Sequence, residues 1–367
     1  MQIFVQAFTG GFDASNPSTN VVERVAAVAE RAGPAGVVIG WNTATDYLPI
    51  VERLHDVGRQ VYLWLPVFSE YGPAASSALD YLGQPHQGAV SGADDDFSFA
   101  CPSQKANIGL VVQYYQRWFV RYGFDGVMLD KIRFSSFGNG FRAGLGCFCP
   151  SCQEYYRNAG VPIDRLAARL QDELNKSWLM PEARVGLGYR FADPLVDGFY
   201  CARAKLITQA VTTIVGQFRQ LNLRVGLDVF APPFAYLVGQ DLPALADLAD
   251  FIKPMTYRVT DSPAGIPYEA AQFKAELTAN RCPIGSQLEE LWATDDLAGR
   301  ACYDSQLKLL AGLDCAVLPG VEVNHLPICA TSPAYVESSL SAIDRAGLAG
   351  AVLSWNVLAE VVYPELD

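Results

Sequence analysis

The sequence predicts a single-domain α/β protein with the (β/α)8 TIM-barrel fold. Eight short runs rich in β-branched and aromatic residues alternate with longer segments of helical periodicity, and Gly, Pro, Asn or Asp bounds each run. One run stands at the start of the 367-residue chain and another close to its end. A doubly wound sheet would normally use fewer strands and a glycine-rich phosphate loop after the first. The Thr9-Gly10-Gly11-Phe12 turn lacks the spacing of such a loop.

The strand predictions rest on continuous apolar runs, which are typical of parallel strands buried on both faces. The predicted strands are residues 2–7, 36–41, 60–66, 125–130, 224–230, 250–255, 316–323 and 350–355. Helical periodicity predicts helices over residues 20–32, 47–57, 105–122, 196–222, 268–279, 303–311 and 333–346. Residues 283–291 (PIGSQLEEL) suit a ninth strand, and we assign them to a long excursion before the seventh.

Two long insertions account for most of the chain beyond the roughly 250 residues of a typical barrel. They cover residues 68–104 after the third strand and 134–195 after the fourth. Both follow the carboxyl end of a strand, where barrel enzymes build their active sites. No repeat or linker divides the chain, so we expect one catalytic domain over residues 1–367.

The composition describes a folded, acidic globule. About 50% of the residues are apolar, 18% are charged, and the net charge is -12. The scattered Lys and Arg side chains of an acidic protein disfavour nucleic acid as a partner. No apolar run approaches the roughly 20 residues that span a bilayer, and no signal peptide is visible. We therefore expect a cytoplasmic protein that does not enter a membrane, and the sequence leaves a homo-oligomer open.

Polar residues lie near the carboxyl ends of the last five predicted strands, either on the strand or just after it. Strand four ends at Asp130, which is followed by Lys131 and Arg133. Because the carboxyl ends of barrel strands meet at one rim, these side chains are expected to share a site with polar residues of the later strands. Those residues are Asp228 on strand five, Lys253 and Tyr257 on strand six, Glu322 on strand seven, and Trp355 and Asn356 on strand eight.

Aromatic residues at the same rim favour a carbohydrate ligand. Trp41 ends strand two, Trp64 lies on strand three, and both offer flat apolar faces. The C–H faces of sugars stack on such planes while their hydroxyls need directional polar partners. Trp355 is expected to form the floor of a subsite. Lys131, Arg133, Lys253 and Tyr257 are expected to orient the sugar or tune the carboxylates.

Glycoside hydrolysis needs two carboxyl groups that flank one bond. Asp130 and Glu322 are expected to face each other across the barrel mouth, and Asp228 competes for either role. The chain has only three His residues, which disfavours a His-centred metal site and a Ser-His-Asp triad.

Residues 124–134 resemble the FDG-x-x-LD-x-(I)-R-(F/Y) strand-four signature of glycoside-hydrolase-like TIM barrels. Leu227-Asp228 and residues 253–257 look like strands five and six of these proteins. Glu322 fits the strand-seven carboxylate of the large group of retaining glycosidases with acid/base and nucleophile on strands four and seven. The resemblance implies a glycosidase in which Glu322 is the nucleophile and Asp130 the general acid/base. The strand-four acid of that group is usually Glu after Asn, whereas Asp130 follows Leu129.

A cysteine cluster lies in the second insertion. Cys147, Cys149 and Cys152 form a C-x-C-x-x-C motif, and Cys101 lies in the first insertion. Four thiolates can close a tetrahedral structural zinc site, which would pin the two insertions together. The arrangement is similar to the zinc cluster of the family 42 β-galactosidases. Free thiols or a disulfide of Cys101 are the alternatives, and we expect no organic cofactor.

Three functions remain open at this stage. The first is a glycosidase, with carbohydrate as its substrate. The second is a carbohydrate-binding barrel without hydrolysis, which the Asp at position 130 in place of the usual Glu favours. The third is a lyase or aldolase with Lys131 or Lys253 as the amine, which requires a lysine that is deprotonated near neutral pH.

Overall fold

The structure is a computed structural model that describes residues 1–12, 35–85, 98–282, 296–324 and 330–354. The predicted helix 20–32, the candidate strand 283–291, and Trp355 and Asn356 lie outside the described residues. No helix of the described part is long and apolar enough to cross a membrane.

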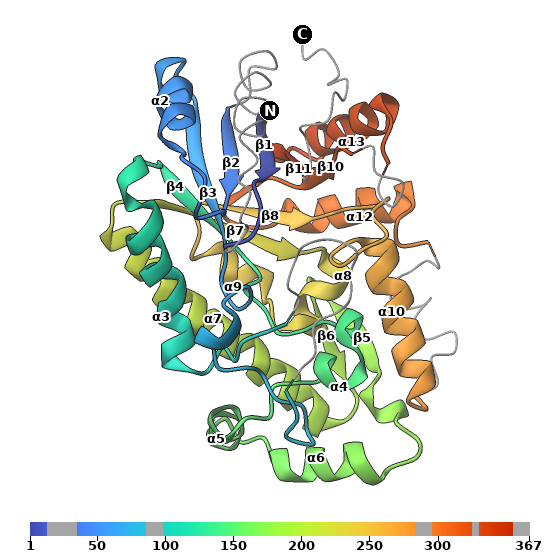
Figure 1. Cartoon of the computed structure of the whole chain (residues 1–367). Coiled ribbons are helices and arrows are strands. Elements are labelled where there is room, and N and C mark those ends of the chain that lie inside the picture. The colour runs from blue at the N-terminus through green and yellow to red at the C-terminus, as the bar shows by residue number, and fades with distance from the viewer. Residues whose placement is uncertain (13–34, 86–97, 283–295, 325–329, 355–367) are drawn as a thin grey trace.

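Nine parallel strands form the central sheet, and the predicted TIM-barrel-like α/β fold is confirmed (Figure 1). Their order in the sheet is β10-β11-β1-β2-β3-β4-β7-β8-β9. The strands are β1 Gln2–Phe8, β2 Gly36–Gly40, β3 Gln60–Pro66, β4 Gly126–Asp130, β7 Arg224–Phe230, β8 Phe251–Met255, β9 Ala316–Val317, β10 Gly320–Glu322 and β11 Gly350–Ser354.

The predicted seventh strand is divided into β9 and β10, and this segment completes the ring. β9 pairs with β8, while β10 pairs with β11. Between them, Leu318 N donates to Ile252 O at 2.9 Å, and Val352 N donates to Pro319 O at 3.1 Å. Pro319 has no N–H to donate, so the ladder is interrupted where the segment passes from one neighbour to the other.

Helices surround the sheet (Figure 1). The long α7, Pro194–Gln220, buries an apolar face that begins at Val196 and continues to Phe218. The predicted helix 105–122 is α-helical only to Tyr114 and continues as a π turn over Tyr115–Phe119 and a 3-10 turn over Val120–Tyr122. The other helices that pack around the sheet are α2 Leu48–Asp56, α3 Lys105–Tyr114, α10 Ile266–Ala279, α12 Arg300–Leu310 and α13 Pro333–Arg345.

The second insertion contains secondary structure that the sequence analysis did not predict. A two-stranded antiparallel hairpin, β5 Pro181–Val185 and β6 Gly188–Phe191, precedes α7. Figure 1 shows the insertion at the end of the molecule away from β1 and β11. Its helices are α4 Phe141–Gly144, α5 Pro150–Asn158 and α6 Ile163–Asp172, and two further short helices, α8 Pro232–Ala235 and α9 Leu242–Ala246, follow β7.

Large aromatic rings fill the barrel near the start of its strands. Phe4, Tyr62 and Phe251 pack with ring centroids 5.4 to 5.9 Å apart. Each ring packs against a glycine at the paired position of a neighbouring strand. A Cβ on that glycine would clash with the ring, so a larger residue does not fit at this position. These glycines are Gly36, Gly126 and Gly226. The polar side chains lie toward the other end of the barrel.

Candidate active site

A pocket of about 60 Å³ opens at the carboxyl ends of the strands. This volume has room for a few water-sized groups, which suits the reacting end of a ligand. The pocket brings together seven of the predicted site residues. They lie on or just after the predicted strands two to six, which are β2, β3, β4, β7 and β8 in the structure. The lining residues are Trp41, Trp64, Asp130, Lys131, Arg133, Asp228, Phe230, Met255, Tyr257, Thr260, Pro263 and Ala264.

Asp130 ends β4 and is held by two N–H donors. Trp64 Nε1 donates to Asp130 Oδ2 at 3.1 Å, and the backbone N of Lys131 donates to Oδ1 at 2.5 Å. These two bonds fix the orientation of the carboxyl group at the end of the strand. The pairing of β3 with β4 places Pro66 opposite Asp130, so the indole of Trp64 reaches the carboxylate from the adjacent strand.

Lys131 forms a buried ion pair with Glu70, a residue that the sequence analysis did not single out. Its ammonium also lies 5.8 Å from the centre of the Trp41 ring. Lys131 and Glu70 both have left-handed backbone conformations, with φ of 52° and 74°. Such conformations cost free energy in non-glycine residues and cluster at functional sites. Glu70 lies in the first insertion, where no periodic pattern marks it.

Arg133 is buried between two aromatic rings. Its guanidinium lies 4.4 Å from the centre of Phe99 and 4.1 Å from that of Phe230. Burial lowers the pKa of Arg133 to about 10, and the charges of Glu269 and Asp130 act in the opposite direction. Arg133 therefore remains a cation at neutral pH. Glu269, which the sequence analysis also missed, is buried on α10.

Asp228, Lys253 and Tyr257 form a buried chain of polar contacts. Lys253 Nζ donates to Asp228 Oδ2 at 2.9 Å and to Tyr257 Oη at 2.5 Å. Burial raises the pKa of Asp228 to about 7, while Lys253 opposes that shift and Asp130 adds to it. Asp228 Oδ1 is buried without a well-formed hydrogen bond among the described residues. The side chain of Gln6 on β1 also acts on this carboxyl group and lowers its pKa.

Lys253 is a cation in this environment. Burial opposes the charged ammonium, yet Asp228 and Tyr257 together raise its pKa above the ordinary value. A lysine that forms a Schiff base needs the opposite shift. Lys253 is thus suited to hold Asp228 in place rather than to act as a nucleophilic amine.

Glu322 lies outside the residues that line the pocket. It is fully buried on β10, and both carboxylate oxygens accept hydrogen bonds. Oε1 accepts from the backbone N of Val259 at 2.6 Å, and Oε2 accepts from Tyr335 Oη at 2.7 Å. Burial raises the pKa of Glu322, and these two donors oppose the shift. The pocket therefore joins Asp130 to Asp228, while Glu322 is bonded to the segment after β8 and to α13.

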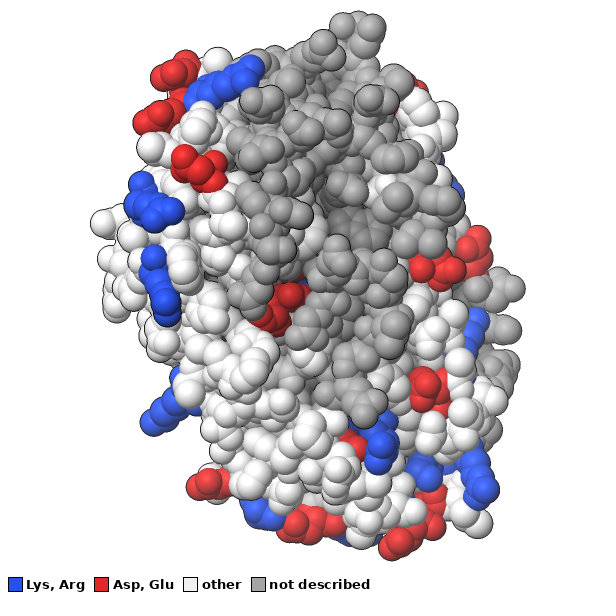
Figure 2. All heavy atoms as spheres, in the orientation of Figure 1, with Lys and Arg blue, Asp and Glu red and all other residues white. Residues whose placement is uncertain are grey.

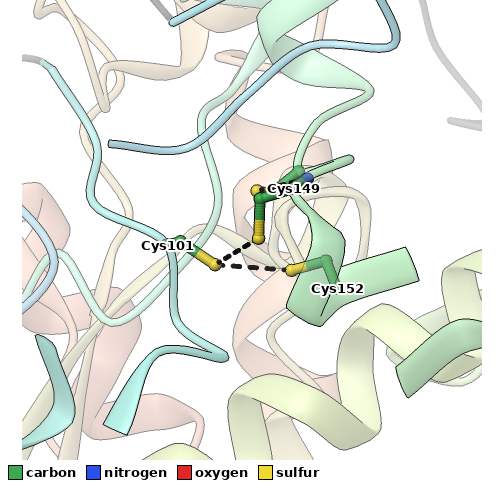
Figure 3. Close-up of side chains that lie close together, drawn as sticks. Cys101, Cys149 and Cys152 are labelled. Carbon is green, nitrogen blue, oxygen red and sulfur yellow. Dashed lines mark hydrogen bonds between the residues drawn. The ribbon is translucent and has the colours of Figure 1, made fainter. Parts of the chain in front are cut away.

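Four cysteines from the two insertions form a buried cluster, and Figure 3 shows three of them, Cys101, Cys149 and Cys152. The Sγ atoms of Cys101, Cys147, Cys149 and Cys152 all lie within 4.8 Å of one another. Cys101 Sγ is 3.3 Å from Cys149 Sγ and 3.5 Å from Cys152 Sγ, and none of the four is in a disulfide. Sulfur ligands that converge in this way fit one tetrahedral metal ion, and four protein ligands leave no open position for a substrate.

Charges of both signs are interspersed on the face shown in Figure 2, without a patch of one sign among the described residues. An acidic side chain is visible in a hollow near the middle of that face. The described residues of this face form no basic track of the kind that binds a phosphate backbone.

Searches of protein-family models and of curated proteins find no match to this sequence. Solved structures do match its fold. The PgaB (BpsB) glycoside hydrolase domain from Bordetella bronchiseptica is 12% identical, with a TM-score of 0.57 over 98% of this chain and 95% of that one.

Two further structures have the same overall arrangement. The spore cortex-lytic enzyme SleL from Bacillus megaterium QM B1551 is 8% identical, with a TM-score of 0.50 over 99% of this chain and 72% of that one. Alpha-L-fucosidase isoenzyme 2 from Paenibacillus thiaminolyticus is 12% identical, with a TM-score of 0.52 over 96% of this chain and 46% of that one. At these identities the comparisons show a shared barrel fold.

Proposed function

We propose that this protein hydrolyses a glycosidic bond, with Asp130 and Asp228 as the two reacting carboxyl groups. The observation that carries the proposal is their shared pocket at the carboxyl ends of β4 and β7, beside Trp41 and Trp64. Carboxyl groups in contrasting environments can divide the acid and base roles, and indole faces suit a sugar ring. The glycoside hydrolase domain among the proteins of similar fold agrees with this proposal.

The environments assign a different role to each carboxyl group. Asp228, whose pKa burial raises to about 7, donates a proton from Oδ1 to the glycosidic oxygen as the C–O bond breaks. Asp130, oriented by the Trp64 and Lys131 N–H groups, attacks the anomeric carbon and forms a glycosyl ester. Water then attacks that ester and returns its proton to Asp228, which restores both groups with retention of configuration.

The cations and aromatic residues of the pocket position the sugar and the carboxyl groups. Trp41 and Trp64 form the stacking surface, and Lys131 and Arg133 donate hydrogen bonds to sugar hydroxyls. Lys253 holds Asp228, and Tyr257 accepts a hydrogen bond from Lys253. Trp355 and Asn356 remain proposed ligand-binding residues that lie outside the described part of the chain.

The sequence alone suggests another pair, with Glu322 as the nucleophile and Asp130 as the acid/base. Variants at the three positions distinguish the two pairs. Wild-type protein, Asp130→Asn, Asp228→Asn and Glu322→Gln are compared on a panel of oligosaccharides and polysaccharides by release of reducing ends. We expect each Asp variant to lose at least about a thousandfold in kcat/KM, which is 4 kcal/mol of transition-state stabilisation. Glu322→Gln should stay within tenfold of wild type, and its inactivity would favour the Glu322 assignment.

A carbohydrate-binding barrel without hydrolysis is the second candidate, favoured by Asp130 in place of the usual strand-four Glu. It predicts saturable binding of one member of the panel without release of reducing ends. Titration calorimetry with the same sugars separates the two. Saturable binding with no cleavage of any sugar in the panel would favour the binding protein over the hydrolase.

We also propose that Cys101, Cys147, Cys149 and Cys152 hold a structural Zn²⁺ that ties the two insertions together. Elemental analysis of the purified protein should find about one zinc per chain, and mercurial displacement from the thiolates should release it. Cys152→Ser should abolish stoichiometric zinc. Cys282→Ser is the matched control, because Cys282 is a buried free thiol outside the cluster. Zinc-free wild-type protein that still loads none when given Zn²⁺ would contradict the site.

A further inference from the structure

Arg203 is a fully buried cation on α7. Its Nη1 donates to Gly144 O at 3.0 Å, whereas Nε and Nη2 are buried without a hydrogen-bond partner among the described residues. The guanidinium lies 4.5 Å from the centre of the Phe134 ring and 5.3 Å from that of Phe199. Aromatic faces stabilise a cation only in part, and a buried charge without an anion is costly.

The surroundings of Arg203 contain thiols where a carboxylate would be expected. Burial lowers the pKa of the guanidinium, and the groups that oppose this shift most are Tyr200, Tyr156, Cys152 and Cys147. Tyrosine hydroxyls are neutral at pH 7. The cysteines of the four-thiol cluster are therefore the groups near Arg203 that metal binding makes anionic.

Arg133 provides the contrast within the same chain. It is also buried between aromatic rings, but the charges of Glu269 and Asp130 act on it. Arg133 thus has carboxylates as counter-ions, whereas an ionised cysteine cluster would serve Arg203.

Hydrogen bonding and ring packing connect Arg203 to the segment that carries the cysteines. Its hydrogen bond to Gly144 O fixes the backbone three residues before Cys147. Phe148, between two of the cysteines, packs on Phe199 of α7 with ring centroids 5.8 Å apart. Tyr156 of α5 packs on the same ring at 5.3 Å. One face of α7 therefore supports both the cysteine loop and the guanidinium.

We infer that Arg203 is the buried counter-ion of the four-cysteine metal site and raises its affinity for a divalent metal. Four thiolates around a divalent ion leave a net negative charge of two, of which the guanidinium offsets one. Backbone N–H groups of Leu79 and Cys149, which donate to Cys147 Sγ at 3.3 and 3.4 Å, stabilise the same charge. This inference rests on the zinc site proposed above.

The test is titration of the metal-free full-length protein with Co²⁺, followed by competition with Zn²⁺, under reducing conditions. Co²⁺ bound by thiolates gives charge-transfer and d–d absorption bands that report binding directly. Arg203→Met removes the charge and keeps an unbranched side chain, and we expect its metal affinity to fall about 10- to 100-fold. Arg203→Lys keeps the charge and should retain most of the affinity.

Arg258→Met is the matched control. Arg258 also stacks on two rings, Tyr303 and Tyr335, at 4.3 and 4.6 Å, on different helices. We expect its metal affinity to equal that of wild type. Circular dichroism establishes that each variant is folded, and Arg203→Gln replaces Arg203→Met if the latter does not fold.

Two results would overturn the role of Arg203 and leave the zinc site standing. One is a folded, uncharged variant that binds Co²⁺ as tightly as wild type. The other is an equal loss in Arg203→Lys and Arg203→Met, since that would show that shape rather than charge matters. Wild-type protein that binds neither Co²⁺ nor Zn²⁺ would overturn the zinc site and this inference together.

Discussion

Asp130 ends β4 and Asp228 lies two residues before the end of the neighbouring β7, yet their surroundings differ in kind. Asp130 receives two N–H donors, whereas Asp228 is buried deeper, with Lys253 at one oxygen and no well-formed hydrogen bond among the described residues at the other. A carboxyl group that burial keeps partly protonated near neutral pH can serve as the proton donor of a glycosidase. The contrast between these two residues is the basis of the proposed division of roles.

The raised pKa of Asp228 predicts how activity depends on pH. A proton donor must be protonated, so kcat/KM should be retained below about pH 7 and fall about tenfold per pH unit above it. Steady-state rates from pH 5 to pH 9 measure this limb. Asp228→Asn should lower kcat/KM and abolish its fall above about pH 7. If this fall is unchanged in the variant, another group is responsible for it.

Glu322 is predicted to stabilise the fold rather than to react. Glu322→Ala leaves the Val259 N–H and the Tyr335 hydroxyl without their acceptor, at about 1–3 kcal/mol for each buried donor. In Glu322→Gln the side-chain oxygen still accepts from Val259, and the Tyr335 hydroxyl can turn to accept from the amide. Chemical denaturation should therefore find Glu322→Ala much less stable than Glu322→Gln, and equal stabilities would contradict the structural role.

Sequence reasoning found the site residues that end strands and missed those that reach it from elsewhere. Asp130 and Asp228 follow from strand periodicity, because the carboxyl ends of barrel strands share one rim. Glu70 and Glu269 lie in an insertion and on a helix, where only the tertiary fold brings them to act on Lys131 and Arg133 of the pocket. The two partners of Glu322 are likewise set by the fold, and no local pattern signals them.

At the scale of elements, the strand predictions agree closely with the structure because apolar runs and their Gly and Pro boundaries are local signals. Strand seven differs since Pro319 interrupts its ladder where the segment changes neighbours. The β5–β6 hairpin was missed because its residues alternate weakly and are partly exposed. The prediction of an α-helix over residues 105–122 is wrong for the last turns, because the backbone leaves α geometry at Tyr115.

Each glycine that faces a large ring on the adjacent strand is predicted to tolerate no larger residue. A Cβ on Gly226 would lie 2.1 Å from the Phe251 ring, so Gly226→Ala should lose about 1–3 kcal/mol of stability through overpacking. Gly216 on α7 is the matched control, because a Cβ there meets nothing within 4 Å. Gly216→Ala should gain about 0.5–1 kcal/mol, as Ala is the better helix former. Denaturant melts measure both, and a neutral Gly226→Ala would contradict the packing account.

At the scale of the whole molecule, the first and the last described strands belong to one sheet. β1 pairs with β11 from Gln2–Gly350 to Val5–Leu353, so the barrel cannot close without both strands. We therefore propose that residues 1–367 fold as one unit and unfold in one cooperative transition. Fluorescence and far-UV circular dichroism should give coincident denaturation curves for the zinc-loaded protein. Two separated transitions would indicate an independent second unit.

The most direct measurement of the central claim is a crystal structure of Asp228→Asn with an oligosaccharide that the wild-type protein cleaves. We expect a sugar ring stacked on Trp41 or Trp64, with its glycosidic oxygen about 2.6–3.2 Å from the side chain of residue 228. The anomeric carbon should face the Asp130 carboxylate. A sugar bound outside this pocket, or one whose glycosidic bond faces Glu322, would contradict the assignment of Asp130 and Asp228 as the reacting pair.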